Sequence, residues 1–467
     1  MKIEQIYTGC LAQGAYYIES KGEVAIIDPL REVQPYIDRA EAEGATIKYI
    51  FETHFHADFV SGHVTLSEKT DAPIIYGPNA NPKFDAIIAE DEQIFELGDV
   101  KIKVLHTPGH TMESTTYLLI DENGQDHAIF SGDTLFLGDV GRPDLAQKAT
   151  NMTQEGLASL LFDSLRNKIM PLADDVLVYP AHGAGSACGK NMMNVTMDNL
   201  GNQKQMNYAL RADMTREEFI QEVTDGLLPP PAYFPLNVKL NKEGYESIDK
   251  VLAKGDNALS PTAFEVAANE TGAVILDVRT KEEFAAGHVP RSIFIGLDGS
   301  FAPWVGALIQ DVQHPILLVA PEDKIEEAVI RLSRVGFDNT IGFLGGGMEA
   351  WKAAGMEVDT VTSLPVEKVA QVLEVTPSTP VFDVRKPSEF TSGHVASAHN
   401  APLDYLNDFL AAFPKEETFY VHCKSGYRSM IAASMLKARG YHNIVDIQGG
   451  FQAITQSDIR VTDQVQA

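Results

Sequence analysis

The sequence predicts an α/β protein in which one large domain precedes two small, similar units. Two observations support this fold class. Strand-like segments alternate with helix-like ones along the chain, and a stretch of about one hundred residues in the second half repeats itself. At 467 residues the chain is long for one domain and has the length of three ordinary ones.

A cluster of candidate metal ligands lies directly after the first clearly apolar strand. Residues 49–51 (Tyr-Ile-Phe) are typical of a buried strand, and His54, His56 and Asp58 alternate just behind them. A strand that ends in such a cluster places several ligand-type side chains at one edge of a sheet. A solvated polar loop would explain one H-x-H by itself. A metal site is favoured because three more ligand-type residues follow, namely His110, Asp133 and His182.

Together these segments resemble the metallo-β-lactamase superfamily over roughly the first half of the chain. The motifs are residues 53–63, T-P-G-H at 107–110, S-G-D-T at 131–134 and P-A-H-G at 180–183. The resemblance implies an αββα sandwich with its metal at one edge. Hydrolases of this superfamily, glyoxalase II included, typically read T-H-x-H-x-D-H, and the final Asp-His pair helps to hold a second zinc. Here the pair is Asp58-Phe59, and phenylalanine offers no lone pair, so we expect a single-metal centre.

Composition restricts the partners and the compartment. Apolar residues make up 44% of the chain and charged residues 22%, which is typical of a soluble globular protein. The net charge of −28 argues against nucleic acid and anionic membranes as partners, and no apolar run is long enough to span a bilayer. Cys10, Cys188 and Cys423 are too few for a disulfide framework, so we expect a cytoplasmic protein with free thiols.

Patterns along the first half predict several further elements. A proline-rich segment, residues 227–235, is expected to be stiff and extended, either as the tail of the first domain or as a linker. Helices are expected over 32–43, 62–69 and 193–209, and strands over 24–27, 74–76, 93–95, 100–105, 117–120 and 127–130.

The second half contains an internal repeat. Residues 273–279 (AVILDVR) return as 379–385 (TPVFDVR), and the G-H-V of 287–289 returns at 393–395. Strand, Asp-Val-Arg turn, helix and strand is the order found in a small parallel α/β sheet. Both copies resemble rhodanese domains, over roughly residues 258–460. The predicted domains are therefore 1–245, 258–360 and 364–467.

Only the second copy contains a candidate nucleophile. Cys423 follows a strand-like segment in a short loop that opens a helix, where backbone N–H groups and the helix dipole favour an anionic sulfur. Four residues separate Cys423 from Arg428, as in sulfurtransferases, whereas tyrosine phosphatases place five there; a buried structural cysteine is the alternative. The rhodanese resemblance implies that Cys423 carries a persulfide sulfur, in a loop completed by Lys424, Ser425, Gly426 and Tyr427. The first copy has Ala320-Pro321-Glu322-Asp323 there and is predicted to be inactive.

Rhodanese units behind a metallo-β-lactamase domain resemble the persulfide dioxygenase–rhodanese fusions. Persulfide dioxygenases use one Fe(II) held by two histidines and a carboxylate, which here would be His54, His110 and Asp133. His56, Asp58 and His182 would then support these ligands without touching iron. Arg142 is a candidate for steadying the site, with a surface salt bridge as the alternative. Cys188 is a possible accessory thiol, with inert packing as the alternative.

We therefore expect an enzyme that oxidises a low-molecular-weight thiol persulfide with O2 to sulfite and transfers sulfur through Cys423 to give thiosulfate. The family also suggests a homo-oligomer. One rival is a zinc thioester hydrolase of the glyoxalase II type, which Phe59 disfavours. The other is a sulfur-carrier or redox-sensing docking protein with a vestigial metal site. The identity of the carrier thiol (glutathione, bacillithiol, coenzyme A or cysteine) stays open at this point, as does the net direction of the sulfur-transfer step.

Overall fold

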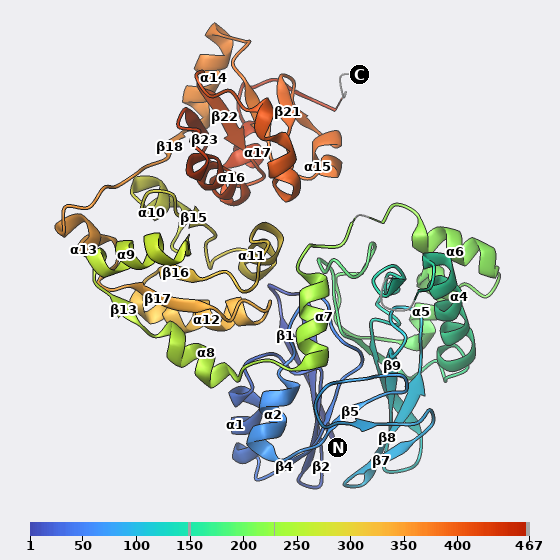
Figure 1. The fold of residues 1–467 in the computed structure, drawn as a ribbon. Helices are drawn as coiled ribbons and strands as arrows, with labels where there is room; N and C mark the ends of the chain where they lie inside the picture. Colours follow the sequence, from blue (N-terminus) through green and yellow to red (C-terminus); the bar gives the residue numbers. More distant parts are fainter. Residues whose placement is uncertain (148–150, 228, 464–467) are drawn as a thin grey trace. The chain divides into compact units, whose positions relative to one another are not determined.

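The computed structural model describes residues 1–147, 151–227 and 229–463, which divide into two compact units (Figure 1). The first unit contains residues 1–250 and 332–336, and the second contains residues 251–331 and 337 onward. The predicted boundaries within the second unit stay predictions, and the last four residues of the predicted domain 364–467 lie outside the described residues.

The first unit is built on two six-stranded sheets. The first sheet has the order β1 (Lys2–Thr8), β2 (Gln13–Ser20), β3 (Glu23–Ile27), β4 (Thr46–Phe51), β5 (Ile74–Tyr76) and β6 (Ile87–Ile88). The second has the order β12 (Asp198–Asn199), β11 (Leu177–Pro180), β10 (Asp126–Gly132), β9 (Thr115–Ile120), β8 (Val100–His106) and β7 (Ile94–Leu97).

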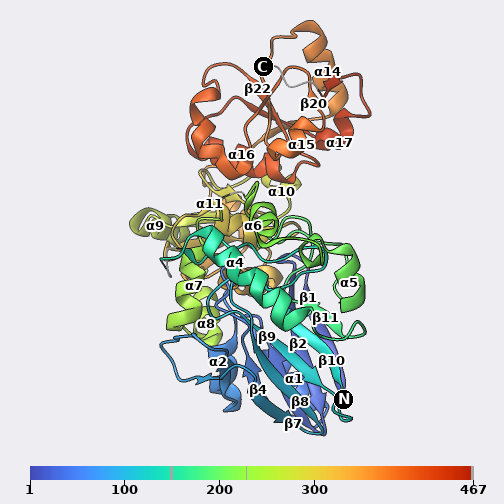
Figure 2. The same cartoon turned by 90° about the vertical axis from the view of Figure 1, so that its right-hand side faces the viewer.

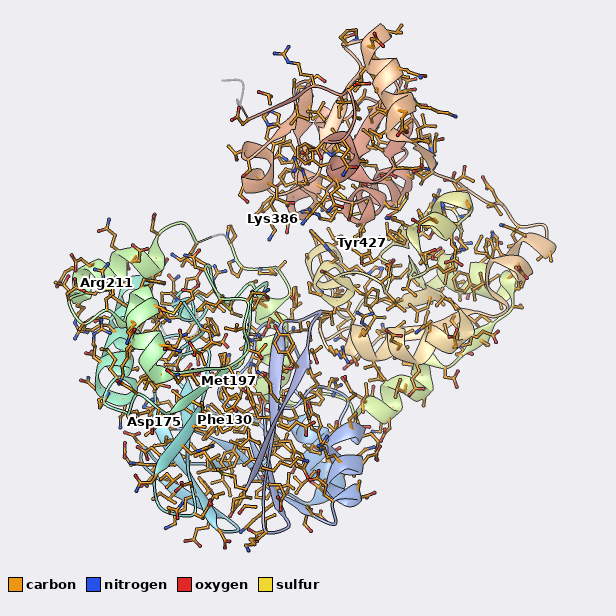
Figure 3. The ribbon with its side chains drawn as sticks, turned by 180° about the vertical axis from the view of Figure 1, so that it is seen from behind. Phe130, Asp175, Met197, Arg211, Lys386 and Tyr427 are labelled. Carbon is orange, nitrogen blue, oxygen red and sulfur yellow. The ribbon has the colours of Figure 1, made fainter. Side chains whose placement is uncertain are left out.

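A hydrophobic core lies between these sheets, and helices cover their outer faces. Alternate residues of facing strands fill the core; Phe51 and Tyr117, for example, come from opposite sheets with ring centroids 4.8 Å apart, and Phe130 is labelled in Figure 3. The outer face of the first sheet is covered by α1 (Gln34–Ala42) and α2 (His63–Thr70). The outer face of the second is covered by α4 (Gln154–Ser164), which continues into a π-helical turn (Leu165–Ile169), α5 (Leu200–Met206), a 3₁₀ turn (Tyr208–Leu210) and α6 (Arg216–Thr224) (Figure 2). The expected αββα sandwich is confirmed.

Two local predictions in the first unit are wrong in part. The helix expected over 193–209 is shorter: Asp198 and Asn199 pair with β11 as a strand, and the Asn199 side chain then caps α5 by accepting the Asn202 N–H. The proline-rich segment was expected to stay extended through Pro235. Instead α7 (Phe234–Glu243) starts with Pro235 in its first turn, a position where the missing N–H costs no helical hydrogen bond. α8 (Ile248–Gly255) follows.

The second unit contains two parallel five-stranded sheets with the same strand order. The first is β13 (Ala258–Leu259), β17 (Thr340–Leu344), β16 (Ile316–Val319), β14 (Val274–Asp277) and β15 (Ile293–Phe294). The second is β18 (Thr362–Leu364), β23 (Ile444–Ile447), β22 (Phe419–His422), β19 (Val381–Asp383) and β21 (Ala398–Asn400). A small antiparallel pair joins β20 (His394–Val395) to β24 (Val461–Thr462). The sequence repeat is therefore also a structural repeat.

Helices pack on both sheets of the second unit. Those of the first repeat are α9 (Pro261–Thr271), α10 (Lys281–Ala286), α11 (Phe301–Leu308), a 3₁₀ turn (Glu322–Lys324), α12 (Ile325–Ser333) and α13 (Gly347–Ala353). Those of the second are α14 (Val366–Val375), α15 (Pro387–Thr391), a 3₁₀ segment (Leu403–Ala412), α16 (Tyr427–Ala438) and α17 (Gly450–Ile454). Within the described residues, none of these or the earlier helices combines the length and apolar character needed to cross a bilayer.

Candidate metal centre and cysteine loop

The candidate metal ligands follow four strands that end at the same edge of the sandwich. His54 comes three residues after β4, His110 four residues after β8, Asp133 directly after β10, and His182 two residues after β11. β10 runs parallel to β11, and both β10 and β8 run antiparallel to β9, which lies between them. The strands β8, β10 and β11 therefore point the same way. The sheet topology therefore gathers residues that are far apart in sequence.

The structure brings together the three ligands predicted from the sequence. His110 Nε2 lies 3.4 Å from Asp133 Oδ2, and His54 Nε2 lies 3.9 Å from the same oxygen. All three side chains are buried, and one donor atom from each lies within 4.8 Å of the others. Two imidazoles and one carboxylate in this arrangement can hold one cation and leave coordination positions open.

Hydrogen bonds fix the orientation of both histidines. Thr53 Oγ1 donates to Asp28 Oδ2 (2.8 Å) and lies 3.0 Å from His54 Nδ1, so its lone pair can accept the Nδ1 proton. His110 Nδ1 lies 2.9 Å from the backbone oxygen of Arg142, to which it can only donate. In both rings the proton therefore lies on Nδ1 and the Nε2 lone pair faces Asp133, which is the form that binds a metal.

The donor set fits a cation. Neither carboxylate oxygen of Asp133 has a hydrogen-bond partner among the described residues, although both are fully buried. Burial lowers the pKa of His54 well below its usual value, and the neighbouring His56, His110 and His182 lower it further, so the ring is neutral. A buried carboxylate without hydrogen-bond partners is costly unless a positive charge compensates it, and a metal ion would supply that charge.

His56 is turned away from this set. Its Nε2 lies 3.1 Å from Asp28 Oδ1 and 3.7 Å from Glu52 Oε2. Burial opposes the charge of His56, but Asp28 and Glu52 outweigh it and raise the pKa of the ring to about 9. Phe59 is also buried and packs against the His56 ring at a centroid distance of 4.4 Å. The phenyl ring of Phe59 has no lone pair to offer a metal.

The remaining predicted residues form a second group beside Asp133. His182 Nε2 lies 3.3 Å from Asp58 Oδ2 and 3.5 Å from Asp133 Oδ1. His182 is a member of two sets of possible ligands, one with His56 and Asp58 and one with Asp133 and Cys188. Burial raises the pKa of the Cys188 thiol well above its usual value, and the charges of Asp58 and Asp133 raise it further. Cys188 is therefore a protonated thiol that lies close to the predicted centre.

Arg142 stabilises the loops around the centre. Its guanidinium makes two bonds to Asp144 (2.6 and 2.7 Å) and donates to Ala187 O, next to Cys188 (3.2 Å). Because its backbone oxygen also accepts from His110, Arg142 connects a predicted ligand to the Cys188 segment. The side chain is buried, which is unlike the alternative of a surface salt bridge.

Asn241 is a supporting residue that the sequence analysis missed. From α7 its amide nitrogen donates to His56 O and Phe59 O (2.8 Å each), and its amide oxygen accepts the Ser61 N–H (2.9 Å). The segment after the proline-rich stretch thus packs on the first domain, as the tail interpretation expected. Its helical pattern after Pro235 was the available signal, but the pattern does not say which loop Asn241 contacts.

The second predicted site is the loop between β22 and α16. Cys423 is buried, and its Sγ accepts the N–H of Gly426 at 3.2 Å. Gly426 has φ of +101°, a conformation that favours glycine, and α16 begins at the next residue. The sulfur therefore lies at the N-terminus of a helix, within a turn of backbone amides.

The Arg428 guanidinium is held by a carboxylate beside the loop. Its guanidinium is bound to both carboxylate oxygens of Glu389, at 2.6 and 2.9 Å. The pKa of Glu389 falls to about 2 because of this bond. A cavity of about 440 Å³ lies beside the loop and is lined in part by Lys424, Arg385 and Phe451.

The first repeat lacks this arrangement. β16 is followed by Ala320 and Pro321 and then by the 3₁₀ turn, in which Glu322 accepts the N–H of Gly346. Pro321 has no N–H, and an acidic turn repels an anionic sulfur. The Asp-Arg pairs, in contrast, are equivalent in the two repeats: Arg279 and Arg385 each bind the aspartate two residues earlier (2.6 Å) and a glycine carbonyl eight residues later. Both pairs hold the turn that follows the strand.

Comparison with known proteins agrees with this division of the chain. A model of the metallo-beta-lactamase superfamily matches residues 8–182, and a model of the rhodanese-like domain matches residues 260–354 and 366–457. A hydroxyacylglutathione hydrolase from Rhodopseudomonas palustris is 30% identical over 234 residues, which cover 44% of this chain and 86% of that protein.

Two solved structures extend the comparison. A metallo-beta-lactamase from Staphylococcus aureus is 31% identical with a TM-score of 0.65, covering 74% of this chain and 98% of that one. ETHE1 from Myxococcus xanthus is 28% identical with a TM-score of 0.45, covering 52% and 98%. The chain belongs to the metallo-beta-lactamase superfamily and carries two rhodanese-like domains behind its metallo-beta-lactamase domain.

Proposed function

We propose that this protein oxidises a low-molecular-weight thiol persulfide with O2 and transfers sulfane sulfur to the sulfite that forms. The observation that carries the proposal is the composition of the metal centre. The buried set of His54, His110 and Asp133 can hold one metal, and Phe59 supplies no donor for a second one. The same chain also carries a cysteine loop of sulfurtransferase type. This loop would use the sulfite that forms at the metal centre.

His54, His110 and Asp133 would hold one Fe(II). Bound there, iron supplies open positions for O2 and for the sulfur of the substrate. Thr53 and the Arg142 carbonyl keep the Nδ1 protons of both histidines in place, and Asp133 contributes the negative charge. Overall, one persulfide, one O2 and one water give one thiol, one sulfite and two protons.

Sulfur transfer would proceed through Cys423. Its thiolate attacks the outer sulfur of a persulfide, the S–S bond breaks, and the carrier leaves as a thiolate. Sulfite then attacks the outer sulfur on Cys423, which forms thiosulfate and restores the Cys423 thiolate. The Gly426 N–H, 3.2 Å from Sγ, would stabilise a thiolate at Cys423, and Lys424 lines the adjoining cavity.

Product analysis of the Cys423→Ser protein tests the proposal. The serine hydroxyl stays protonated near neutral pH and cannot hold a sulfane sulfur. With a persulfide substrate and iron loaded anaerobically, O2 uptake should be unchanged, and sulfite should accumulate in place of thiosulfate. Glu322→Gln, at the equivalent turn of the first repeat, is the matched control and should change neither product. Unchanged thiosulfate formation by Cys423→Ser would show that another residue transfers sulfur.

A zinc thioester hydrolase is the second candidate, because a similar protein carries the name hydroxyacylglutathione hydrolase. The two functions differ in metal and substrate. Protein with two zinc ions per chain that hydrolyses a glutathione thioester and consumes no O2 with persulfides would establish the hydrolase instead.

A further inference from the structure

One peptide bond of the cysteine loop is contacted from both sides. The N–H of Gly426 donates to Cys423 Sγ at 3.2 Å, and the carbonyl oxygen of Ser425, which belongs to the same peptide, accepts from Lys281 Nζ at 3.0 Å. The N–H and C=O of a trans peptide point in opposite directions. The ammonium group of Lys281 therefore lies opposite the sulfur, with the peptide between them.

The carbonyl oxygen of Ser425 accepts from the first repeat, whereas three other carbonyl oxygens of the loop accept from the second repeat. These three contacts are Phe451 N–H to Cys423 O (2.7 Å), Gln452 N–H to Lys424 O (3.0 Å) and the Ser429 hydroxyl to Gly426 O (3.2 Å). Lys281 is the first residue of α10 in the first repeat, the one without a cysteine. That repeat thus supplies the fourth carbonyl contact of the loop.

The peptide bond between Ser425 and Gly426 can rotate easily unless another group fixes its orientation. Gly426 has no Cβ and φ of +101°, so rotation of the 425–426 peptide meets little steric resistance. Such a rotation would turn the Ser425 carbonyl oxygen, which carries a partial negative charge, toward the Cys423 sulfur. Arg428 does not prevent this with a free charge, because Glu389 binds its guanidinium. An ammonium group on the carbonyl side favours the observed orientation and polarises the N–H toward the sulfur.

Further contacts between the two repeats fix the position of Lys281. The Tyr427 hydroxyl donates to Gly296 O at 2.7 Å, and Tyr427 is labelled in Figure 3. Its ring lies so close to Gly299 that a Cβ there would be 2.3 Å from Tyr427 Cζ. The Phe294 N–H donates to Ser434 Oγ in α16 at 2.9 Å. A capping box of Thr280 with Glu283 fixes the start of α10.

We propose that Lys281 is a positioning residue for sulfur transfer at Cys423. It holds the 425–426 peptide with its N–H toward the sulfur and thereby stabilises the thiolate and the terminal persulfide anion. The inference rests on the proposed sulfur-transfer role of Cys423, and it gives the first repeat a function although it has no nucleophile. Lys281 touches neither sulfur nor substrate, so it acts through the loop backbone.

The test compares three variants of the full-length protein. Lys281→Met keeps an unbranched side chain and removes the donor and its charge, whereas Lys281→Arg keeps both. Asp359→Asn is the matched control, because it weakens the 3.0 Å ion pair with Lys437 between the same two repeats and leaves the loop untouched. The readout is the rate at which iodoacetamide alkylates Cys423 at neutral pH, measured by mass spectrometry on the Cys423 peptide, with the Cys10 and Cys188 peptides as internal references.

Lys281→Met should alkylate Cys423 about tenfold more slowly, which is the size expected for loss of one charged hydrogen bond. Lys281→Arg should recover at least half of the rate, and Asp359→Asn should match the unaltered protein. Both tryptophans, Trp304 and Trp351, lie in the first repeat, so their fluorescence checks that it stays folded. In the same preparations, loading of Cys423 with sulfur from thiosulfate should fall in parallel with alkylation.

Alkylation of the Lys281→Met protein at or above the unaltered rate would overturn the inference. An equal loss in Asp359→Asn would overturn it too, because docking of the repeats, and not the loop peptide, would then be responsible. The proposed function fails separately. If alkylation follows the expected order but Cys423→Ser still produces thiosulfate, Lys281 positions the loop and Cys423 is not the transfer residue.

Discussion

Replacing Asn241 by alanine should loosen the loop that carries the candidate metal ligands. The amide of Asn241 makes three hydrogen bonds, to His56 O, Phe59 O and the Ser61 N–H, each at 2.8–2.9 Å in the buried interior. Alanine leaves a buried N–H and two carbonyls without this partner, at a net cost of about 2–3 kcal/mol. At about 1.4 kcal/mol per factor of ten, opening of the loop should become roughly 30- to 150-fold more frequent.

Hydrogen exchange measured by mass spectrometry on peptides covering residues 54–66 is the assay, because the Ser61 amide is one of the protected groups. Asn237→Ala is the matched control. Asn237 is one helical turn earlier in α7 and equally buried, but its side-chain amide has no hydrogen-bond partner among the described residues. Protection should fall by less than about threefold in that variant. Equal protection in the two variants would refute the conclusion that Asn241 holds the loop.

Three further outcomes are expected. Asp133→Ala removes the only carboxylate of the proposed iron set and should abolish iron binding, whereas His182→Ala should keep its iron. If elemental analysis finds iron in Asp133→Ala and none in His182→Ala, the ligand assignment is wrong. Phe59→His places an imidazole next to Asp58 and should raise zinc binding from one to two ions per chain, measured by equilibrium dialysis. An unchanged number of zinc ions would contradict the conclusion that Phe59 removes a ligand for a second metal. The pKa of Glu389, normally near 4.5, is about 2 beside Arg428, so this pair stabilises the fold above pH 4.5 and loses its effect as the pH falls toward 2. Glu389→Gln should therefore weaken the dependence of Tm on pH in that range, and identical acid profiles would contradict the pairing.

The sandwich and the position of its metal centre could be predicted because both depend on local patterns. Apolar strands such as β4 and β10 end directly before ligand-type residues, and His54, His110 and Asp133 therefore meet at one sheet edge. The orientation of His56 could not be predicted. It depends on the carboxylates of Asp28 and Glu52, which reach the ring through tertiary packing, and an H-x-H pattern is the same for either orientation.

Long-range polar contacts also explain what was missed in the second unit. The repeat and its parallel sheets follow from segments that recur in sequence, and the two observed strand orders agree. The spacing between Cys423 and Arg428 indicates the loop but says nothing about Glu389, which lies on α15 and binds the arginine. Lys281 is separated from Ser425 by most of two repeats, so its contact arises only when the repeats pack.

The two buried cysteines lie in opposite electrostatic environments, and this difference decides which one suits sulfur transfer. Cys188 lies among carboxylates, and the charges of Asp58 and Asp133 raise its pKa beyond the effect of burial, so it stays a thiol. Cys423 instead faces the Gly426 N–H at the start of α16, and the opposite end of that peptide is bound by a lysine ammonium group. Sulfur transfer requires an anionic nucleophile. The proposed sulfur transfer is therefore assigned to Cys423.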